Sequence, residues 1–189
     1  MFNYLALPSL TIASQIMHQG GVVAYPTEAV WGLGCDPFNK RAVHSLLTLK
    51  QRSVDKGLIL IASDIEQFDF ILKDLSNSQI KTMHDTWPGP VTWIVPTNAY
   101  IPHWISGVHK GVAIRVSGHP IVRALCKIYG GPIVSTSANT QGHPSAKSQW
   151  QVKRYFKNKL ALDFITQGVV GKRLNPSQIF DLHTRSVIR

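Results

Sequence analysis

Short apolar runs recur along the chain, and segments with helical spacing or polar residues separate them. The clearest runs lie at residues 22–25, 58–62, 91–95, 112–116 and 132–135, followed by 162–165 and 178–182. The run at residues 58–62 (LILIA) is continuously apolar, which is typical of a strand that is covered on both faces. This pattern limits the chain to folds that are built around a largely buried sheet.

Helical spacing alternates with these runs. It is seen at residues 10–17, 39–49, 119–129 and 148–156, where Asn39 is suited to cap a helix and Pro120 to its first turn. No linker, repeat or low-complexity tract divides the sequence. Residues 1–189 are therefore predicted to form a single α/β domain with a twisted, mixed sheet.

The composition excludes several classes of protein. The 189 residues are 44% apolar, which allows one sizeable core, but no stretch of 18 apolar residues predicts a membrane span. The first 15 residues lack the basic and long apolar parts of a signal peptide. Cys35 and Cys126 have no metal or redox spacing, so we expect reduced core cysteines in a cytoplasmic protein.

The charge is strongly positive, with 20 Lys and Arg against 10 Asp and Glu. The excess is uneven, because residues 143–189 hold nine basic and two acidic side chains. A basic excess attracts nucleotides and RNA alike, without choosing between them.

Polar residues follow the first apolar run at once. Thr27 and Glu28 come just after residues 22–25, and Gly32 and Gly34 predict a turn beyond them. In open α/β sheets, ligands bind in crevices at strand ends. This segment is therefore a candidate part of a binding site.

Two cations lie two positions apart, at Lys50 and Arg52. An extended segment would direct both side chains to one face, where they suit a polyphosphate. A solvated charged loop is the alternative interpretation.

Arg115 lies inside an apolar run, and a buried charge needs a partner. A substrate carboxylate or phosphate is one candidate. An internal salt bridge with Glu28 or Asp36 is the structural alternative.

The segment 134–146 (VSTSANTQGHPSA) is rich in hydroxyl and amide side chains. These groups and exposed backbone N–H groups suit an anion, although such residues also make up ordinary surface loops. Similarly, residues 86–93 (TWPGPVTW) predict either an aromatic platform for bases or part of the core.

Several catalytic motifs are missing from the sequence. The eight histidines show no HxxxH or HExxH spacing, no G-x-S-x-G elbow occurs, and neither cysteine has a motif around it. The sequence therefore predicts no tightly held metal site and no protein nucleophile.

Several of these segments together resemble the YrdC family. The motifs that carry the resemblance are AYPTEAVWGLGCDP, LKQR, KGLILIA, WPGPVTW, VAIRV, HP, STSANTQG and LNPSQIFD, in that order. The resemblance extends from about Ser9 to Arg189. Ser53 departs from it, because the family usually has proline there; this loosens the loop and leaves both cations in place.

The resemblance implies an open, twisted α/β sheet with a basic concave face and a nucleotidyltransferase activity. L-threonine, bicarbonate and ATP, with Mg²⁺ accompanying the ATP, would give threonylcarbamoyl-adenylate and pyrophosphate. The product would feed a partner complex that modifies tRNA beside the anticodon. Direct contact of this chain with tRNA or double-stranded RNA is left open.

The resemblance also implies roles for individual residues. Those expected at the nucleotide phosphates, as the catalytic set, are Lys50, Arg52, Ser137 and Asn139. Those expected to reach the rest of the nucleotide are Ser145 and Arg189. Those expected at the threonine substrate are Thr27, Arg115, Ser135 and Ser177.

Two other functions compete with this one. A non-catalytic RNA-binding module would use the same basic surface, with strongly salt-dependent affinity and no threonine-dependent ATP consumption. Carbamoyl transfer through carbamoyl-adenylate occurs in a related domain of hydrogenase-maturation proteins. Those chains carry zinc-finger and acylphosphatase-like parts that this sequence does not contain.

Overall fold

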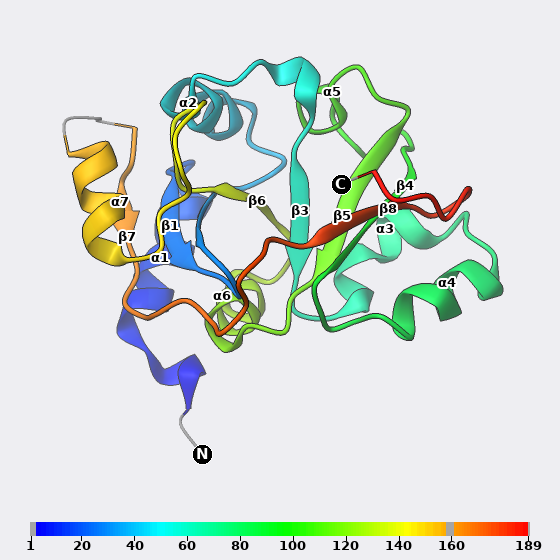
Figure 1. Cartoon of the computed structure of the whole chain (residues 1–189), viewed down its shortest axis with the longest axis horizontal. Helices are drawn as coiled ribbons and strands as arrows, with labels where there is room; N and C mark the ends of the chain where they lie inside the picture. The colour runs from blue at the N-terminus through cyan, green and yellow to red at the C-terminus, as the bar shows by residue number, and fades with distance from the viewer. Residues whose placement is uncertain (1–2, 158–160, 189) are drawn as a thin grey trace.

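A mixed sheet runs through the middle of the molecule (Figure 1). The computed structural model describes residues 3–157 and 161–188. Within these residues the strand order is β7-β1-β2-β6-β3-β5-β4-β8. The strands are β1 (Val23–Pro26), β2 (Trp31–Gly34), β3 (Ile59–Ala62), β4 (Val91–Pro96), β5 (Gly111–Val116), β6 (Ile133–Ser137), β7 (Phe164–Ile165) and β8 (Gln178–Asp181).

Both directions of pairing occur in the sheet. β1 pairs with β7, β3 with β5, and β4 with β8 in parallel, whereas the other neighbouring pairs are antiparallel. The α-helices are α1 (Pro8–His18), α2 (Lys40–Lys50), α3 (Asp69–Leu72), α4 (Asn77–His84), α5 (His103–Ser106), α6 (Pro120–Tyr129) and α7 (Gln149–Phe156). Short 3₁₀ turns are η1 (Tyr4–Ala6), η2 (Val54–Lys56) and η3 (Ile65–Phe68). The predicted α/β class with an open mixed sheet and flanking helices is confirmed.

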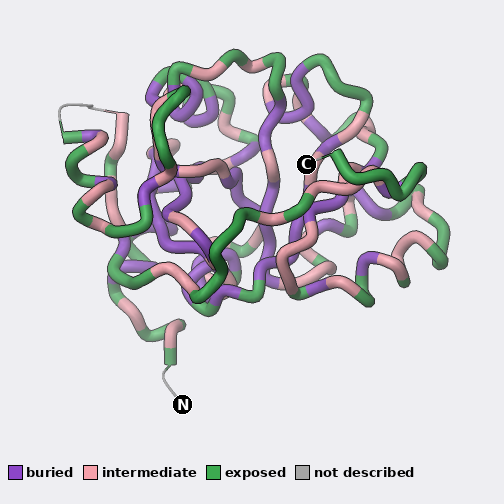
Figure 2. Tube along the Cα trace, in the orientation of Figure 1, coloured by how far each residue is buried: buried purple, intermediate pink, exposed green. Residues whose placement is uncertain are grey.

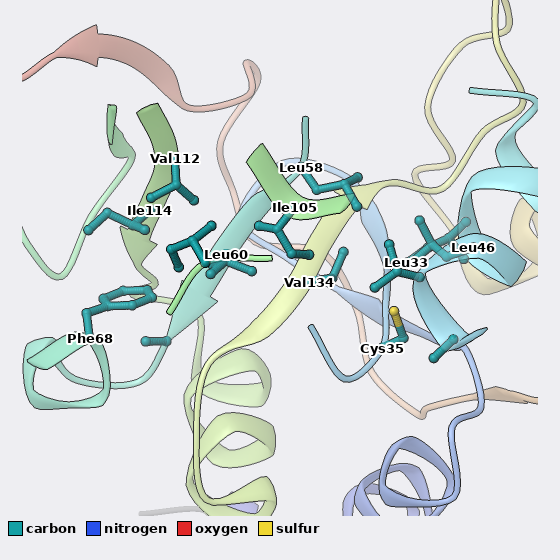
Figure 3. Packing of buried hydrophobic residues seen from close by; sticks show 14 of the residues in the cluster. Leu33, Cys35, Leu46, Leu58, Leu60, Phe68, Ile105, Val112, Ile114 and Val134 are labelled. Atoms are coloured by element: carbon teal, nitrogen blue, oxygen red, sulfur yellow. The ribbon is translucent and has the colours of Figure 1, made fainter. Parts of the chain in front are cut away.

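The two faces of the sheet bury separate apolar clusters. Val23 and Tyr25 of β1 pack with α1 and α6, while Ala24 between them belongs to the cluster on the other face. This alternation follows from the two-residue period of a strand. Figure 3 shows the larger cluster, to which Ala24 belongs. In it, Leu60 and Val134 lie among side chains from several other segments.

The predicted strands and the four longer predicted helices are all present. Trp87 and Trp93 are buried in the larger cluster, so the two tryptophans of the segment 86–93 belong to the core. Cys35 and Cys126 are also buried and free, and burial raises the pKa of both thiols. In the part of the chain that the structure describes, no helix is long and apolar enough to span a membrane.

The predicted turn around Gly32 and Gly34 is wrong, because these residues belong to strand β2. β2 pairs with β1 on one side and β6 on the other. A Cβ atom on Gly34 would lie 2.3 Å from the Val134 carbonyl oxygen and 2.9 Å from the Tyr25 hydroxyl. Gly34 therefore serves close packing within the sheet, and the chain reverses earlier, where Thr27 N–H donates to Val30 O (3.0 Å).

The short helices α3 to α5 were not predicted from the sequence. A local signal was present for α4, because Ser76 and Gln79 form a reciprocal capping box at its start. The apolar pattern of α3 and α5 covers only four residues each, which is too short to show a helical period.

Candidate active site

A cavity of about 230 Å³ opens at the sheet and collects residues from distant parts of the chain. All four residues expected at threonine line it: Thr27, Arg115, Ser135 and Ser177. Three of the residues expected at the nucleotide line it as well: Arg52, Ser137 and Ser145. Strands β5 and β6, the segments that follow β1, α2 and β6, and the segment before β8 thus bring both sets to one cavity.

Two further predicted residues lie directly behind this lining. Lys50 and Asn139 do not line the cavity, but both contact Ser137. The Lys50 ammonium donates to the Ser137 carbonyl, to Asn139 O (2.9 Å) and to Asn139 Oδ1 (3.0 Å). The Ser137 hydroxyl donates to the same Oδ1 atom (2.7 Å). Lys50 thereby holds the loop after β6 in place. Arg189 lies outside the described residues.

The predicted extended segment at Lys50 and Arg52 is wrong. Helix α2 continues to Lys50, and Gln51 closes it in the left-handed conformation (φ 54°, ψ 45°). Arg52 N–H then donates back to Leu47 O (3.0 Å), as in a helix C-cap. This turn separates the two cations, so that Lys50 meets the β6 loop and Arg52 faces the cavity.

Lys50 is only 5% exposed. Burial, followed by the nearby Arg52 charge, lowers the pKa of Lys50 to about 8. The amine therefore remains mostly protonated at neutral pH. Its three acceptors match the three donors of an ammonium group.

Arg115 and Glu28 form a buried ion pair, and both residues line the cavity. Their side chains are 9% and 13% exposed, and Arg115 donates an N–H to Glu28 Oε2 (3.2 Å). The other carboxylate oxygen accepts from the Ser117 hydroxyl (2.7 Å) and from Gly118 N–H (3.1 Å). The internal salt bridge that was the alternative interpretation of Arg115 is therefore present, with Glu28 as its partner. Arg115 also lines the cavity. Glu28 orients it there.

The two hydroxyls at the cavity edge differ in what they can offer a ligand. Thr27 Oγ1 donates its proton to Val30 O (2.8 Å), so its oxygen remains available as an acceptor. Ser177 Oγ accepts from Thr92 Oγ1 (2.9 Å), which leaves the Ser177 proton for donation. Thr27 can therefore accept a hydrogen bond from an amine of the ligand, and Ser177 can donate one to an anionic oxygen.

Residues 169–177, which we call the strap, cross one face of the sheet between β7 and β8 (Figure 1, orange to red). The His119 ring bonds Val169 O (3.2 Å), Gly171 N–H donates to Thr27 O (2.9 Å), and Arg173 N–H donates to Glu28 O (3.1 Å). A Cβ atom on Gly171 would lie 2.8 Å from the Glu28 carbonyl oxygen, so glycine permits this approach. The strap brings Arg173 and three residues after it to the cavity.

Arg173 was not predicted as a site residue from the sequence, although it is one of the basic residues in excess among the last 47. The bonds that fix the strap, among them the backbone bond from Arg173 to Glu28, 145 positions earlier, place it at the site. No local pattern carries that information.

The chain is similar to known proteins along most of its length. The Sua5/YciO/YrdC family model, described as "Telomere recombination", matches residues 15–189. The chain belongs to this family. Two curated relatives carry the name threonylcarbamoyl-AMP synthase. The relative from Cellvibrio japonicus is 49% identical over all of this chain and 99% of its own length, and that from Saccharophagus degradans is 54% identical over 100% and 98%.

The fold of this Sua5/YciO/YrdC chain also matches a solved structure with a ligand. The crystal structure of P. abyssi Sua5 complexed with L-threonine superposes with a TM-score of 0.84 at 31% identity, over 91% of this chain. The chain spans about half the length of that protein, since it covers 50% of it.

Glu28 gives this family member a pH-dependent stability. Burial would raise the pKa of Glu28, but the Arg115 charge and the Ser117 hydrogen bond outweigh it and hold the pKa below its usual 4.5. The buried His119, whose pKa is lowered by burial, lies close enough to add to this effect when it is charged.

A carboxyl with a lowered pKa stabilises the fold above its unfolded pKa, and this stabilisation is lost as the pH falls through the folded pKa. We therefore expect Glu28→Gln to cost stability at pH 7, and to cost progressively less below about pH 4.5. Urea unfolding of both proteins between pH 7 and pH 3 measures this difference. A constant difference over that range would contradict the assignment.

Proposed function

We propose that this chain is a threonylcarbamoyl-AMP synthase, which joins L-threonine, bicarbonate and ATP into threonylcarbamoyl-adenylate and releases pyrophosphate. The observation that carries this proposal is one cavity lined by both predicted sets of residues. The threonine set is Thr27, Arg115, Ser135 and Ser177, and the nucleotide set is represented by Arg52, Ser137 and Ser145. The L-threonine in the related P. abyssi structure supports the amino acid as substrate. The names of the curated relatives support the reaction.

The amino acid would bind at the Arg115 side of the cavity. The Arg115 guanidinium suits the threonine carboxylate, since it forms charge-assisted bonds with such a group. The free lone pairs of Thr27 Oγ1 suit the ammonium, and the Ser177 hydroxyl is available to donate to an oxygen of the substrate. Ser135 closes this pocket from strand β6.

The nucleotide would bind at the opposite side. Arg52, with Ser137 and Ser145, would face the phosphates, while Lys50 and Asn139 hold the Ser137 loop. A cavity of about 230 Å³ is smaller than most ligand pockets, which start near about 300 Å³. It therefore suits the amino acid and the phosphates, and the adenosine would extend toward the open rim. Arg189 stays a prediction.

Mg²⁺ enters this proposal as part of the Mg–ATP substrate. Within the described residues no group of three His, Cys, Asp or Glu side chains could hold a metal ion. Glu28, which lines the cavity, is engaged by Arg115 and Ser117. Mg²⁺ is commonly held largely by substrate phosphates and water, with few protein ligands.

The chemistry needs positioning and charge stabilisation more than a protein nucleophile. The threonine ammonium group and bicarbonate give a carbamate, water and a proton. A carbamate oxygen then forms a bond to the α-phosphorus, the bond from that phosphorus to the bridging oxygen breaks, and pyrophosphate leaves. Holding the two anions in line and stabilising the leaving phosphates would supply most of the acceleration.

The product would pass to a complex that transfers the threonylcarbamoyl group to tRNA, in the cytoplasm. The formal charge of +10 and the pI near 9.9 support attraction to RNA in general. The name shared by the curated relatives favours the enzyme over the RNA-binding module and over carbamoyl-adenylate transfer.

Pyrophosphate release by the purified protein tests the proposal. We expect release from Mg–ATP only when L-threonine and bicarbonate are both present. Serine, which lacks one methyl group, should lower kcat/KM by about 10- to 200-fold. ATP consumption that does not depend on threonine, or RNA binding without any ATP consumption, would contradict the proposal.

A further inference from the structure

The cavity contains a third arginine, Arg173, whose charge has no partner among the described residues. Among the described lining residues the formal charges are Arg52, Arg115, Arg173 and Glu28. Arg115 is paired with Glu28, and Arg52 donates to Lys56 O (3.3 Å) and Gly57 O (3.0 Å). Within residues 3–157 and 161–188, no ion pair or side-chain hydrogen bond engages the Arg173 guanidinium.

Arg173 has a fixed backbone and an exposed side chain. Its N–H donates to Glu28 O, and two residues earlier Gly171 N–H donates to Thr27 O. The residue itself is exposed, as Figure 2 shows for this part of the strap. An anchored backbone with an unpaired guanidinium at the rim of a cavity suits a ligand anion.

The position of Arg173 places it on the threonine side. Its backbone bonds the segment that carries Thr27, whose hydroxyl is an acceptor suited to the substrate amine. Arg173 also lies four residues before Ser177 on the same strap. Arg52, in contrast, follows the end of α2, two positions after Lys50, whose ammonium donates to the Ser137 carbonyl.

The proposed reaction replaces the positive ammonium of threonine with a negatively charged carbamate. Free threonine carries an ammonium and a carboxylate and has no net charge. Its carbamate carries two negative charges, because the ammonium nitrogen loses two protons and gains a carboxylate. The Arg115–Glu28 pair is neutral overall and already serves the first carboxylate. Thr27 has donated its proton to Val30 O, so it has none to offer the new oxygens.

We propose that Arg173 binds the carbamate of N-carboxythreonine and holds it for attack on the α-phosphorus. This inference rests on the proposed function and adds a residue to it. The guanidinium would pair with the carbamate oxygens as they form, which favours carboxylation of the bound amine. It would also offset the repulsion between the carbamate and the Glu28 carboxylate nearby.

The test compares Arg173→Ala with Lys172→Ala, a neighbouring exposed strap cation that does not line the cavity. Pyrophosphate release is measured against bicarbonate at saturating threonine and Mg–ATP. We expect Arg173→Ala to lower kcat/KM for bicarbonate by about 10- to 100-fold, as for the loss of a charge-assisted hydrogen bond. Lys172→Ala should match the wild type, and Arg173→Lys should recover part of the loss, because it keeps the charge without the planar fork.

Threonine binding without bicarbonate, measured by calorimetry, separates this role from others. Arg173→Ala should change the threonine Kd less than about threefold, because the zwitterion already has Arg115. An equal loss for threonine and bicarbonate would assign Arg173 to the threonine carboxylate and overturn the inference. Unchanged bicarbonate kinetics would overturn it as well.

Two further measurements keep the result interpretable. Amide exchange at Gly171 and Arg173 should be the same in Arg173→Ala as in the wild type, since both strap bonds are made by the backbone. Faster exchange together with the kinetic loss would assign Arg173 to the strap structure and overturn the inference. A wild-type protein without threonine-dependent pyrophosphate release would overturn the proposed function, and this inference with it.

Discussion

Replacing Arg52 by alanine is expected to lower threonine-dependent pyrophosphate release by about 10²- to 10³-fold, the cost of one preorganised donor in other active sites. Arg52 lines the cavity, and its guanidinium is aimed by two hydrogen bonds to the carbonyls of Lys56 and Gly57. A donor that is already oriented loses little entropy when charge develops on the leaving phosphates. Steady-state assays at saturating threonine and bicarbonate measure the effect in kcat.

Arg41→Ala is the matched control for this experiment. Arg41 lies on α2, the helix that leads to Arg52, and is exposed. Removing it changes the net charge by the same amount without touching the cavity, so its kcat should remain near that of the wild type. Arg52→Lys should fall between the two, because lysine keeps the charge but not the fork. A kcat for Arg52→Ala within threefold of the Arg41→Ala value would refute the phosphate role.

The strands and longer helices were predictable because their signals are local. A buried strand shows as a continuous apolar run, and a cap such as Asn39 shows directly before its helix, where its side chain accepts from Ala42 N–H. Short helices such as α5, with four residues, offer no period to detect.

The two wrong predictions, for residues 32–34 and 50–52, concern backbone conformations that the neighbouring sequence does not indicate. Gly32 and Gly34 resemble turn residues, but the second is required by the close approach of Val134 O and Tyr25. Gln51 adopts the left-handed conformation without being glycine, so the end of α2 between Lys50 and Arg52 has no usual marker.

The sequence predicted which residues lie at the cavity better than it predicted how they are arranged there. The resemblance supplied the residues, and the cavity brings together seven of the ten predicted. The pairing of Arg115 with Glu28 remained one of several alternatives, since the two are 87 positions apart in the sequence. Arg173 was not predicted because a backbone hydrogen bond to Glu28 holds it at the cavity. Such a bond does not depend on residue type, so it is not visible in the sequence.

Arg115→Ala should strongly destabilise the fold. It leaves Glu28 as an unpaired carboxylate that is 13% exposed, and removing one partner of a buried pair costs about 3–5 kcal/mol. Arg123→Ala is the control, because Arg123 pairs with Asp64 at 3.3 Å with both side chains more than a third exposed. Such a pair contributes about 0–1 kcal/mol. Urea denaturation of both variants gives the two free energies of unfolding.

The double variant Arg115→Ala with Glu28→Gln separates the structural role of the pair from its role toward substrate. Glutamine removes the unpaired charge and can still accept from Ser117 and Gly118, so most of the lost stability should return. Threonine affinity should not return, because the cation that would bind the carboxylate is still missing. If calorimetry instead showed near-normal threonine binding in the refolded double variant, Arg115 would serve the fold alone. The carboxylate of threonine would then need another partner in the cavity.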